Sequence, residues 1–97
     1  MRVEYHPALE RELREIIHYY NERSTGLGDE FLEEFERQVL KIASNPYQWV
    51  EIERGVRRAL LRRFPYTVYF RVVSKDLLRI TVAKHQRRHP VLGLNRK

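Results

Sequence analysis

The feature that most constrains this chain is a change in the spacing of its apolar residues near residue 46. Before that point they recur every three or four residues, which is the period of a helix with one buried face. After it they alternate with polar residues at every second position, which is the period of a β-strand. A chain of 97 residues supplies one hydrophobic core, so both halves are expected to form a single domain over residues 1–97.

Two helices are predicted in the first half, separated by the turn-forming residues 24–28. The first has an apolar stripe made of Leu9, Leu13, Ile16, Ile17 and Tyr20. The second has a stripe made of Leu27, Phe31, Phe35, Val39 and Ile42, and Asn45-Pro46 ends it. So short a break favours an antiparallel helical hairpin, and Tyr19 and Tyr20 are expected in the core beside Phe31 and Phe35.

Four strands are predicted, at residues 2–5, 56–61, 66–73 and 77–84, because these segments are rich in valine, isoleucine, leucine and aromatic residues. Ser74-Lys75-Asp76 suits a hairpin connection between the last two. The predicted architecture is therefore α+β with the order βααβββ. The helical hairpin is expected to pack on one face of a mostly antiparallel four-stranded sheet.

Alternation along the last two strands predicts which side chains face the helices. Those expected to point inward are Val68, Phe70, Val72, Leu78, Ile80 and Val82. Those expected on the opposite, open face are Thr67, Tyr69, Arg71, Arg79, Thr81 and His85. The strand at residues 56–61 contains or adjoins four arginines, Arg57, Arg58, Arg62 and Arg63. A shift of one residue in its register would exchange the arginines on its two faces, so the sequence leaves open which of them face outward.

Charge is distributed unequally between the two halves. Residues 1–53 contain 6 Lys/Arg against 12 Asp/Glu, and residues 54–97 contain 13 against 1, which gives net charges of −6 and +12. This segregation predicts a basic surface that attracts polyanions, either nucleic acid or an acidic protein segment. Several arginines in one strand repel one another, so they need an anionic partner or a solvated edge, and the partner is favoured.

Composition excludes several kinds of site. Without cysteine the chain has no disulfide, no thiolate nucleophile and no cysteine-bound zinc. His85 and His89 are four residues apart, but Pro90 argues against a helix there and no third ligand is evident, so neither a metal site nor a cofactor is predicted. No apolar run reaches the roughly 18 residues of a membrane helix, and no signal-peptide core is evident, so a cytoplasmic location without membrane contact is expected.

Several short motifs follow one another along the whole chain. They are a "Gly-x-Arg" before a strand at Gly55-Val56-Arg57, a turn at Phe64-Pro65-Tyr66, and a closing "His-x-x-Arg-x-Pro" at residues 85–90. The first residues, from Val3 to Leu9, and the pair Tyr19-Tyr20 complete the pattern. In order and spacing the chain resembles the RelE/ParE toxin superfamily of type II toxin–antitoxin systems, especially its ParE-like plasmid-stabilisation branch.

The resemblance implies a growth-inhibiting toxin that a cognate antitoxin neutralises. It leaves two targets open, DNA gyrase, as in ParE-like members, and mRNA in the ribosomal A site, as in RelE-like members. Whether the chain is an enzyme, a ribosome-dependent endoribonuclease, depends on that choice. Two alternatives are a non-catalytic basic RNA-binding module and a degenerate toxin without activity.

Cleavage of RNA at a 2′-hydroxyl requires a base, an acid and cations around the phosphate. The candidates for proton transfer are His85 as acid and Glu51 or Glu53 as base, with Lys84 beside them. The candidates for binding the target or a polyanion are Arg57, Arg58, Arg62, Arg63, Tyr69, Arg71, Arg79, Arg87 and Arg88. The match to the ribonuclease pattern is incomplete. The strand at residues 66–73 begins with Tyr66-Thr67, whereas the corresponding strand of RelE-like ribonucleases carries an arginine near its start. Cleavage and gyrase inhibition therefore stay equally open.

Overall fold

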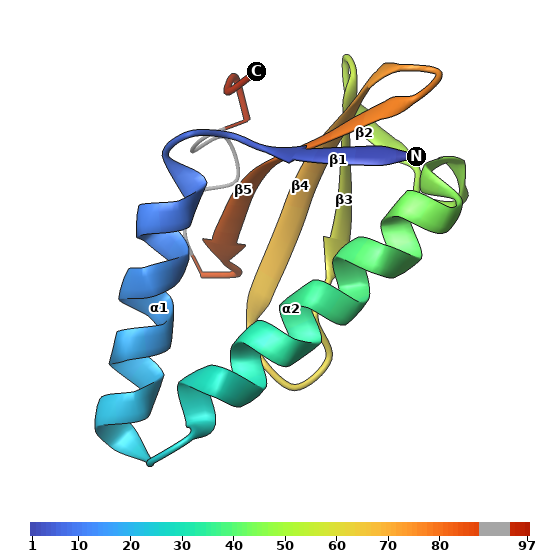
Figure 1. Cartoon of the computed structure of the whole chain (residues 1–97). Helices are drawn as coiled ribbons and strands as arrows, with labels where there is room; N and C mark the ends of the chain where they lie inside the picture. The colour runs from blue at the N-terminus through green and yellow to red at the C-terminus, as the bar shows by residue number, and fades with distance from the viewer. Residues whose placement is uncertain (88–93) are drawn as a thin grey trace.

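The computed structural model describes residues 1–87 and 94–97. Their elements are, in chain order, β1 (Arg2–Tyr5), α1 (Leu9–Arg23), α2 (Leu27–Ser44), the 3-10 turn η1 (Pro46–Gln48), β2 (Glu51–Glu53), β3 (Val56–Leu60), β4 (Tyr66–Ser74) and β5 (Leu77–His85) (Figure 1). The strands form one sheet in the order β1-β5-β4-β3-β2. The predicted α+β class is confirmed. Within the described residues, neither helix has the length and apolar character needed to cross a membrane.

The sheet has five strands and is mixed, so the prediction of four mostly antiparallel strands was close but not right in detail. β1 pairs with β5 in parallel, whereas the other neighbours are antiparallel. The strand that the sequence did not predict is β2, which has three exposed residues, Glu-Ile-Glu, and joins β3 through an irregular register. It carries no apolar face that alternation would reveal, because both of its faces contact solvent.

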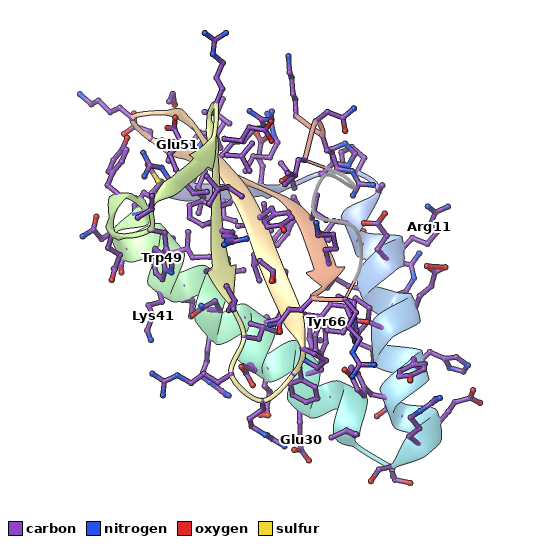
Figure 2. The ribbon with its side chains drawn as sticks, turned by 180° about the vertical axis from the view of Figure 1, so that it is seen from behind. Arg11, Glu30, Lys41, Trp49, Glu51 and Tyr66 are labelled. Atoms are coloured by element: carbon purple, nitrogen blue, oxygen red, sulfur yellow. The ribbon has the colours of Figure 1, made fainter. Side chains whose placement is uncertain are left out.

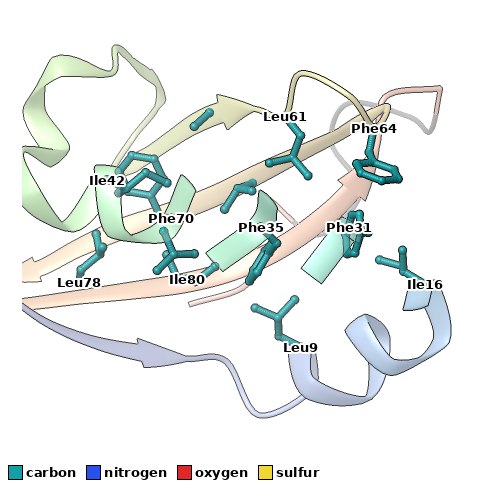
Figure 3. Close-up of a cluster of buried hydrophobic side chains, with 13 residues drawn as sticks. Leu9, Ile16, Phe31, Phe35, Ile42, Leu61, Phe64, Phe70, Leu78 and Ile80 are labelled. Carbon is teal, nitrogen blue, oxygen red and sulfur yellow. The ribbon is translucent and has the colours of Figure 1, made fainter. Parts of the chain in front are cut away.

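Both helices cover the same face of the sheet, with α2 running diagonally across it and α1 standing beside β5 (Figure 1). The predicted stripes form the core, which is drawn in Figure 3 and contains Leu9, Ile16, Phe31, Phe35, Val39 and Ile42 from the helices and Ala59, Leu61, Phe64, Val68, Phe70, Leu78 and Ile80 from the sheet half. Each fully buried valine, leucine, isoleucine or phenylalanine side chain of this core stabilises the fold by about 1.5–3 kcal/mol.

The two helices meet closely at Gly28, in the first turn of α2. A Cβ atom at position 28 would lie 2.1 Å from the carbonyl oxygen of Ile17, so only glycine fits against α1 here. The Gly28 amide donates a 2.7 Å hydrogen bond to Oδ1 of Asn21. That bond satisfies one of the amides that the start of a helix leaves without a backbone partner, and it fixes the angle of the hairpin.

An irregularity in β5 changes the faces that simple alternation predicts. Tyr69 pairs with Val82 and Phe70 pairs with Ile80, so Thr81 is an extra residue in β5, and its hydroxyl donates a hydrogen bond to the Tyr69 carbonyl. Beyond this bulge the side chains exchange faces. Val82 therefore lies on the open face with Val56 and Tyr69 instead of against the helices, so its predicted position was wrong.

The same bulge moves the end of β5. His85 pairs with Tyr66, whose ring packs against the helix-side core, and the two ring centroids are 5.2 Å apart. Simple alternation predicts His85 on the open face, and this prediction is also wrong, because the extra residue Thr81 moves every later side chain of β5 to the opposite face. Lys84 takes the open-face position instead, in the row of Thr67.

Candidate functional site

A groove of about 1130 Å³ runs between α1 and the second half of β5. It exists because β1 pairs with β5 only as far as Ile80, so the edge from Thr81 to His85 has no neighbouring strand among the described residues. The apolar part of its lining consists of Ile16, Tyr19, Tyr20, Leu27, Pro65, Tyr66, Val82 and Ala83. We call this surface the α1–β5 groove.

Packed aromatic rings hold one wall of the α1–β5 groove in place. The ring of Tyr20 lies 5.0 Å from that of Phe64, 5.8 Å from that of Phe31 and 6.4 Å from that of Tyr66, measured between centroids. Burial raises the pKa of the Tyr20 phenol above its ordinary value. Tyr20 is thus a core residue, as the helical spacing predicted, and it also faces the groove.

Tyr19 departs from the expectation of a core residue. Its side chain is exposed on the groove rim, and the guanidinium carbon of Arg23 lies 3.6 Å from its ring centroid. The helical stripe does not include position 19, so the period of the helix already separated it from the core residues. An exposed tyrosine stacked under an arginine offers a partner both apolar area and positive charge.

Charged side chains along the groove are mostly basic. The basic ones are Arg11, Arg23, Lys84, Arg87 and Arg96, whereas the acidic ones are Glu12 and Glu15. An occupant with carboxylates beside apolar residues would complement this lining better than a basic or uniformly polar one.

The last four residues of the chain, Leu94–Lys97, lie across the open face of the sheet and form what we call the C-terminal strap. Arg96 donates hydrogen bonds of 2.8 and 2.9 Å to the two carboxylate oxygens of Glu12 and one of 3.1 Å to the Thr81 carbonyl. The hydrogen bond from Arg96 lowers the pKa of the Glu12 carboxyl group, and Glu12 in turn raises the pKa of Arg96. Leu94 packs on the apolar patch formed by Val56, Tyr69 and Val82.

Arg71 holds the same strap from the sheet. Its guanidinium donates hydrogen bonds to the carbonyl groups of Arg96 at 3.0 Å, Leu94 at 3.1 Å and Arg54 at 3.4 Å. The sequence predicted Arg71 as a residue that binds the target or a polyanion. The structure places its donors on backbone carbonyl groups of the chain itself, which gives Arg71 a structural role.

Within the part of the chain that the structure describes, four ion pairs join the basic second half to the acidic first half. They link Arg57 to Glu51 at 3.6 Å, Arg63 to Glu30 at 2.7 Å, Arg79 to Glu4 at 2.9 Å and Arg96 to Glu12 at 2.8 Å. Arg57 also donates to the Trp49 carbonyl and lies 5.2 Å from the Tyr47 ring centroid. Part of the segregated charge therefore holds the two halves of the chain together.

Other predicted cations differ in their surroundings. Arg58, Arg62 and Arg87 are exposed, and in the described part of the chain none of their side chains forms an ion pair or a hydrogen bond. Tyr69 is 4% exposed beneath Lys84, whose Nζ lies 4.7 Å from its ring centroid. Arg88 was also predicted to bind the target, and it lies outside the described residues, as do His89 and Pro90.

The predicted proton-transfer groups are not brought together. β3 and β4 separate His85 on β5 from Glu51 and Glu53 on β2, a gap of roughly 14 Å across the sheet. Figure 2 shows Glu51 far from Tyr66, the cross-strand partner of His85. Lys84 adjoins His85 in sequence but projects from the other face of the sheet, and Nδ1 of His85 accepts a 3.1 Å hydrogen bond from the Arg87 amide.

Comparison with known proteins gives the chain a family. A family model described as the ParE toxin of the type II toxin–antitoxin system parDE matches residues 3–90. None of the curated proteins matches. Among solved structures, a chain of the chromosomal ParDE toxin–antitoxin system from P. aeruginosa has a similar fold, with a TM-score of 0.76 and 19% sequence identity over 88% of this chain and 95% of that one. The resemblance noted in the motifs is confirmed, and the chain belongs to the ParE toxin family of type II toxin–antitoxin systems.

Proposed function

We propose that this chain inhibits growth in the cytoplasm by blocking DNA gyrase, without cutting mRNA, and that a cognate antitoxin neutralises it. The observation that carries the proposal is the distance between His85 and the two β2 glutamates, Glu51 and Glu53, across the sheet. An acid and a base that act on one phosphodiester must both reach its reacting atoms within hydrogen-bond distance. Residues at opposite sides of this sheet do not meet that condition.

The remaining candidates bind charge and do not transfer protons. Arginine stays protonated at any ordinary pH, so Arg58, Arg62 and Arg87 can attract an anion but cannot act as base. Among the predicted polyanion-binding residues, Arg57, Arg63, Arg71 and Arg79 already have partners inside the chain. These features favour a toxin that acts by binding its target.

We propose the α1–β5 groove as the site of the antitoxin. An extended segment with apolar residues would fill the lining around Tyr19 and Tyr20, and its acidic residues would face the basic rim. The strand edge from Thr81 to His85 offers main-chain groups to such a segment, as in recognition by strand addition.

An RNA-binding module is the weaker alternative. Proteins that read RNA on an open sheet stack bases on exposed aromatic rings. The one aromatic ring that the described strands place on the open face is Tyr69, and it is buried beneath Lys84 and Leu94. The open face therefore supports base stacking poorly.

Expression of the chain with and without the small gene beside its own tests the proposal. We expect growth arrest from the chain alone, and rescue together with co-purification when the neighbour is present. Tyr19→Glu should weaken the complex by about tenfold or more, because it removes groove area and adds a charge, and should leave growth arrest intact. Tyr47→Glu is the matched control, since Tyr47 is also exposed, at 61% against 48% for Tyr19, but lies next to Arg57, away from the groove. Free expression without arrest, and without a bound neighbour, would refute the proposal.

A further inference from the structure

Arg58, Leu60 and Arg62 form an exposed row on β3 and the turn after it, which we call the arginine row. The register with β4 places Arg58 beside Tyr69 and Leu60 beside Thr67, so both side chains project from the open face. Leu60 is 54% exposed between the two arginines. Arg62 follows in the turn and is exposed as well.

The neighbouring arginines do not share this situation. Arg57 points to the helix side, where Trp49 and Glu51 bind it, and Arg63 pairs with Glu30 of α2. Glu34 of α2 accepts a hydrogen bond from the backbone amide of Arg62 at 2.6 Å, which fixes the turn without engaging the Arg62 side chain. The two pairs of arginines at positions 57–58 and 62–63 thus divide into two residues that stabilise the fold and two that stay available to a partner.

The arginine row also lies at an edge of the sheet. The pairing of β2 with β3 ends at Arg57, so residues 58–60 have no strand beyond them among the described residues. The side-chain amide of Gln38 covers one backbone group there by donating a 3.1 Å hydrogen bond to the Leu60 carbonyl. A partner can therefore approach Arg58 and Leu60 both from the open face and from the side.

This surface is separate from the α1–β5 groove. β4 and β5 lie between β3 and the groove, so a distance of roughly 10 Å separates the two surfaces across the sheet. A segment lying in the groove leaves the arginine row uncovered unless it also wraps around the sheet.

We propose that the arginine row is a second docking surface, which binds an acidic protein segment with an apolar residue between its carboxylates. This inference rests on the proposed function, since such a segment would belong to the inhibited target. Two like charges on either side of an exposed leucine repel each other until carboxylates lie beside them, and the leucine adds contact area that a nucleic acid backbone would not use. No exposed aromatic ring accompanies the row in the described strands, which disfavours single-stranded nucleic acid.

Titration of the ¹⁵N-labelled chain with a blocked peptide, acetyl-Asp-Glu-Leu-Glu-Asp-amide, and separately with an octamer of uridine, tests the inference by NMR. We expect the peptide to shift the amide resonances of residues 58–62 in a saturable way. The double variant Arg58→Glu/Arg62→Glu should weaken that binding by about tenfold or more. The double variant Arg2→Glu/Lys75→Glu makes the same charge change at the far side of the sheet, on exposed residues, and should bind as the parent chain does.

Any one of three NMR results would overturn the inference: no shift at residues 58–62 with millimolar peptide, tighter binding of the uridine octamer than of the peptide at these residues, or equal losses in both double variants. In cells, Arg58→Glu/Arg62→Glu should abolish growth arrest while the chain still folds and co-purifies with its antitoxin. Arrest that persists in this variant also contradicts the inference. If the parent chain itself causes no arrest, the proposed function fails, and the peptide titration still decides whether the arginine row is a docking surface.

Discussion

Arg96 and Glu12, 84 residues apart in sequence, form a two-pronged ion pair that fastens the C-terminal strap to the start of α1. The side chains of Arg96 and Glu12 are only 22% and 27% exposed, so water screens the pair less than it screens a surface salt bridge. Because Arg96 also lines the α1–β5 groove, the strap and the groove share one wall.

Replacement of Glu12 by glutamine should loosen the strap. The variant keeps one hydrogen-bond acceptor but loses the charge, and the chain should lose about 1 kcal/mol of stability at neutral pH. In protein produced as residues 1–97, carboxypeptidase B, which removes C-terminal lysine and arginine, should remove exposed Lys97 readily from both the parent and the variant. It should then release Arg96 several-fold faster from Glu12→Gln. Glu10→Gln is the matched control, since among the described residues Glu10 pairs with Arg14 alone, on the exposed side of α1.

The same pair predicts a dependence of stability on pH. Arg96 holds the pKa of folded Glu12 below its ordinary value of 4.5, so folding favours the ionised carboxylate. The stability from this pair is fully present above about pH 4.5 and is lost as the pH falls through the lower, folded pKa. Urea unfolding between pH 6 and pH 3 should show the parent chain and Glu12→Gln converging below pH 4.5. A stability difference that stays constant over this range would contradict the account.

Arg71→Gln should free the strap from the sheet side. The substitution removes the donors to the Leu94 and Arg96 carbonyl groups, and a loss of about 1.4 kcal/mol in local stability corresponds to about tenfold faster release of Arg96 by carboxypeptidase B. Arg79→Gln is the control, because Arg79 is the cross-strand neighbour of Arg71 and pairs with Glu4 instead. Equal release rates in the two variants would argue against a structural role for Arg71.

Gly28→Ala should destabilise the helical hairpin. Alanine gains helix propensity, but its methyl group would collide with the Ile17 carbonyl, and overpacking of this kind costs about 1–3 kcal/mol. Urea denaturation should show a net loss of about 2 kcal/mol, whereas Glu33→Ala on the exposed side of α2 should change stability by less than about 0.5 kcal/mol. An unchanged or raised midpoint for Gly28→Ala would show that the helices cross farther apart.

His85→Ala should leave toxicity nearly unchanged if the chain does not cleave RNA. Loss of a residue that transfers a proton would lower cleavage by about 100-fold or more, whereas loss of a side chain packed on Tyr66 changes only local stability. The inducer concentration that halves growth measures toxicity. A shift of about 100-fold in His85→Ala, with the protein still folded, would support catalysis by His85.

The helices and four of the five described strands were predictable because their apolar residues follow a clear period. Glu51–Glu53 was not, since an exposed strand of three residues has no apolar alternation to detect. The faces of Val82 and His85 were predicted wrongly because the bulge at Thr81 adds one residue to β5. Bulges depend on the pairing of two strands, so the pattern within one strand does not reveal them.

The site was predictable only in part, for a related reason. The change from acidic to basic near residue 54 predicts a basic surface whose arginines attract anionic partners, and whether a polyanion binds there stays a prediction. For Arg63, Arg79 and Arg96 those partners are glutamates of the first half, brought together only by the fold. Sequence alone does not separate such internal pairs from arginines available to a partner, whereas the register of β3 does so for Arg58.

The most direct test of the central claim, a toxin that blocks gyrase without cleaving RNA, combines two assays on one protein. Purified chain is added to a gyrase supercoiling reaction, and primer extension is run on mRNA from cells that express it. The account predicts inhibited supercoiling together with intact mRNA. Normal supercoiling together with codon-associated cuts in mRNA, abolished by His85→Ala, would contradict it.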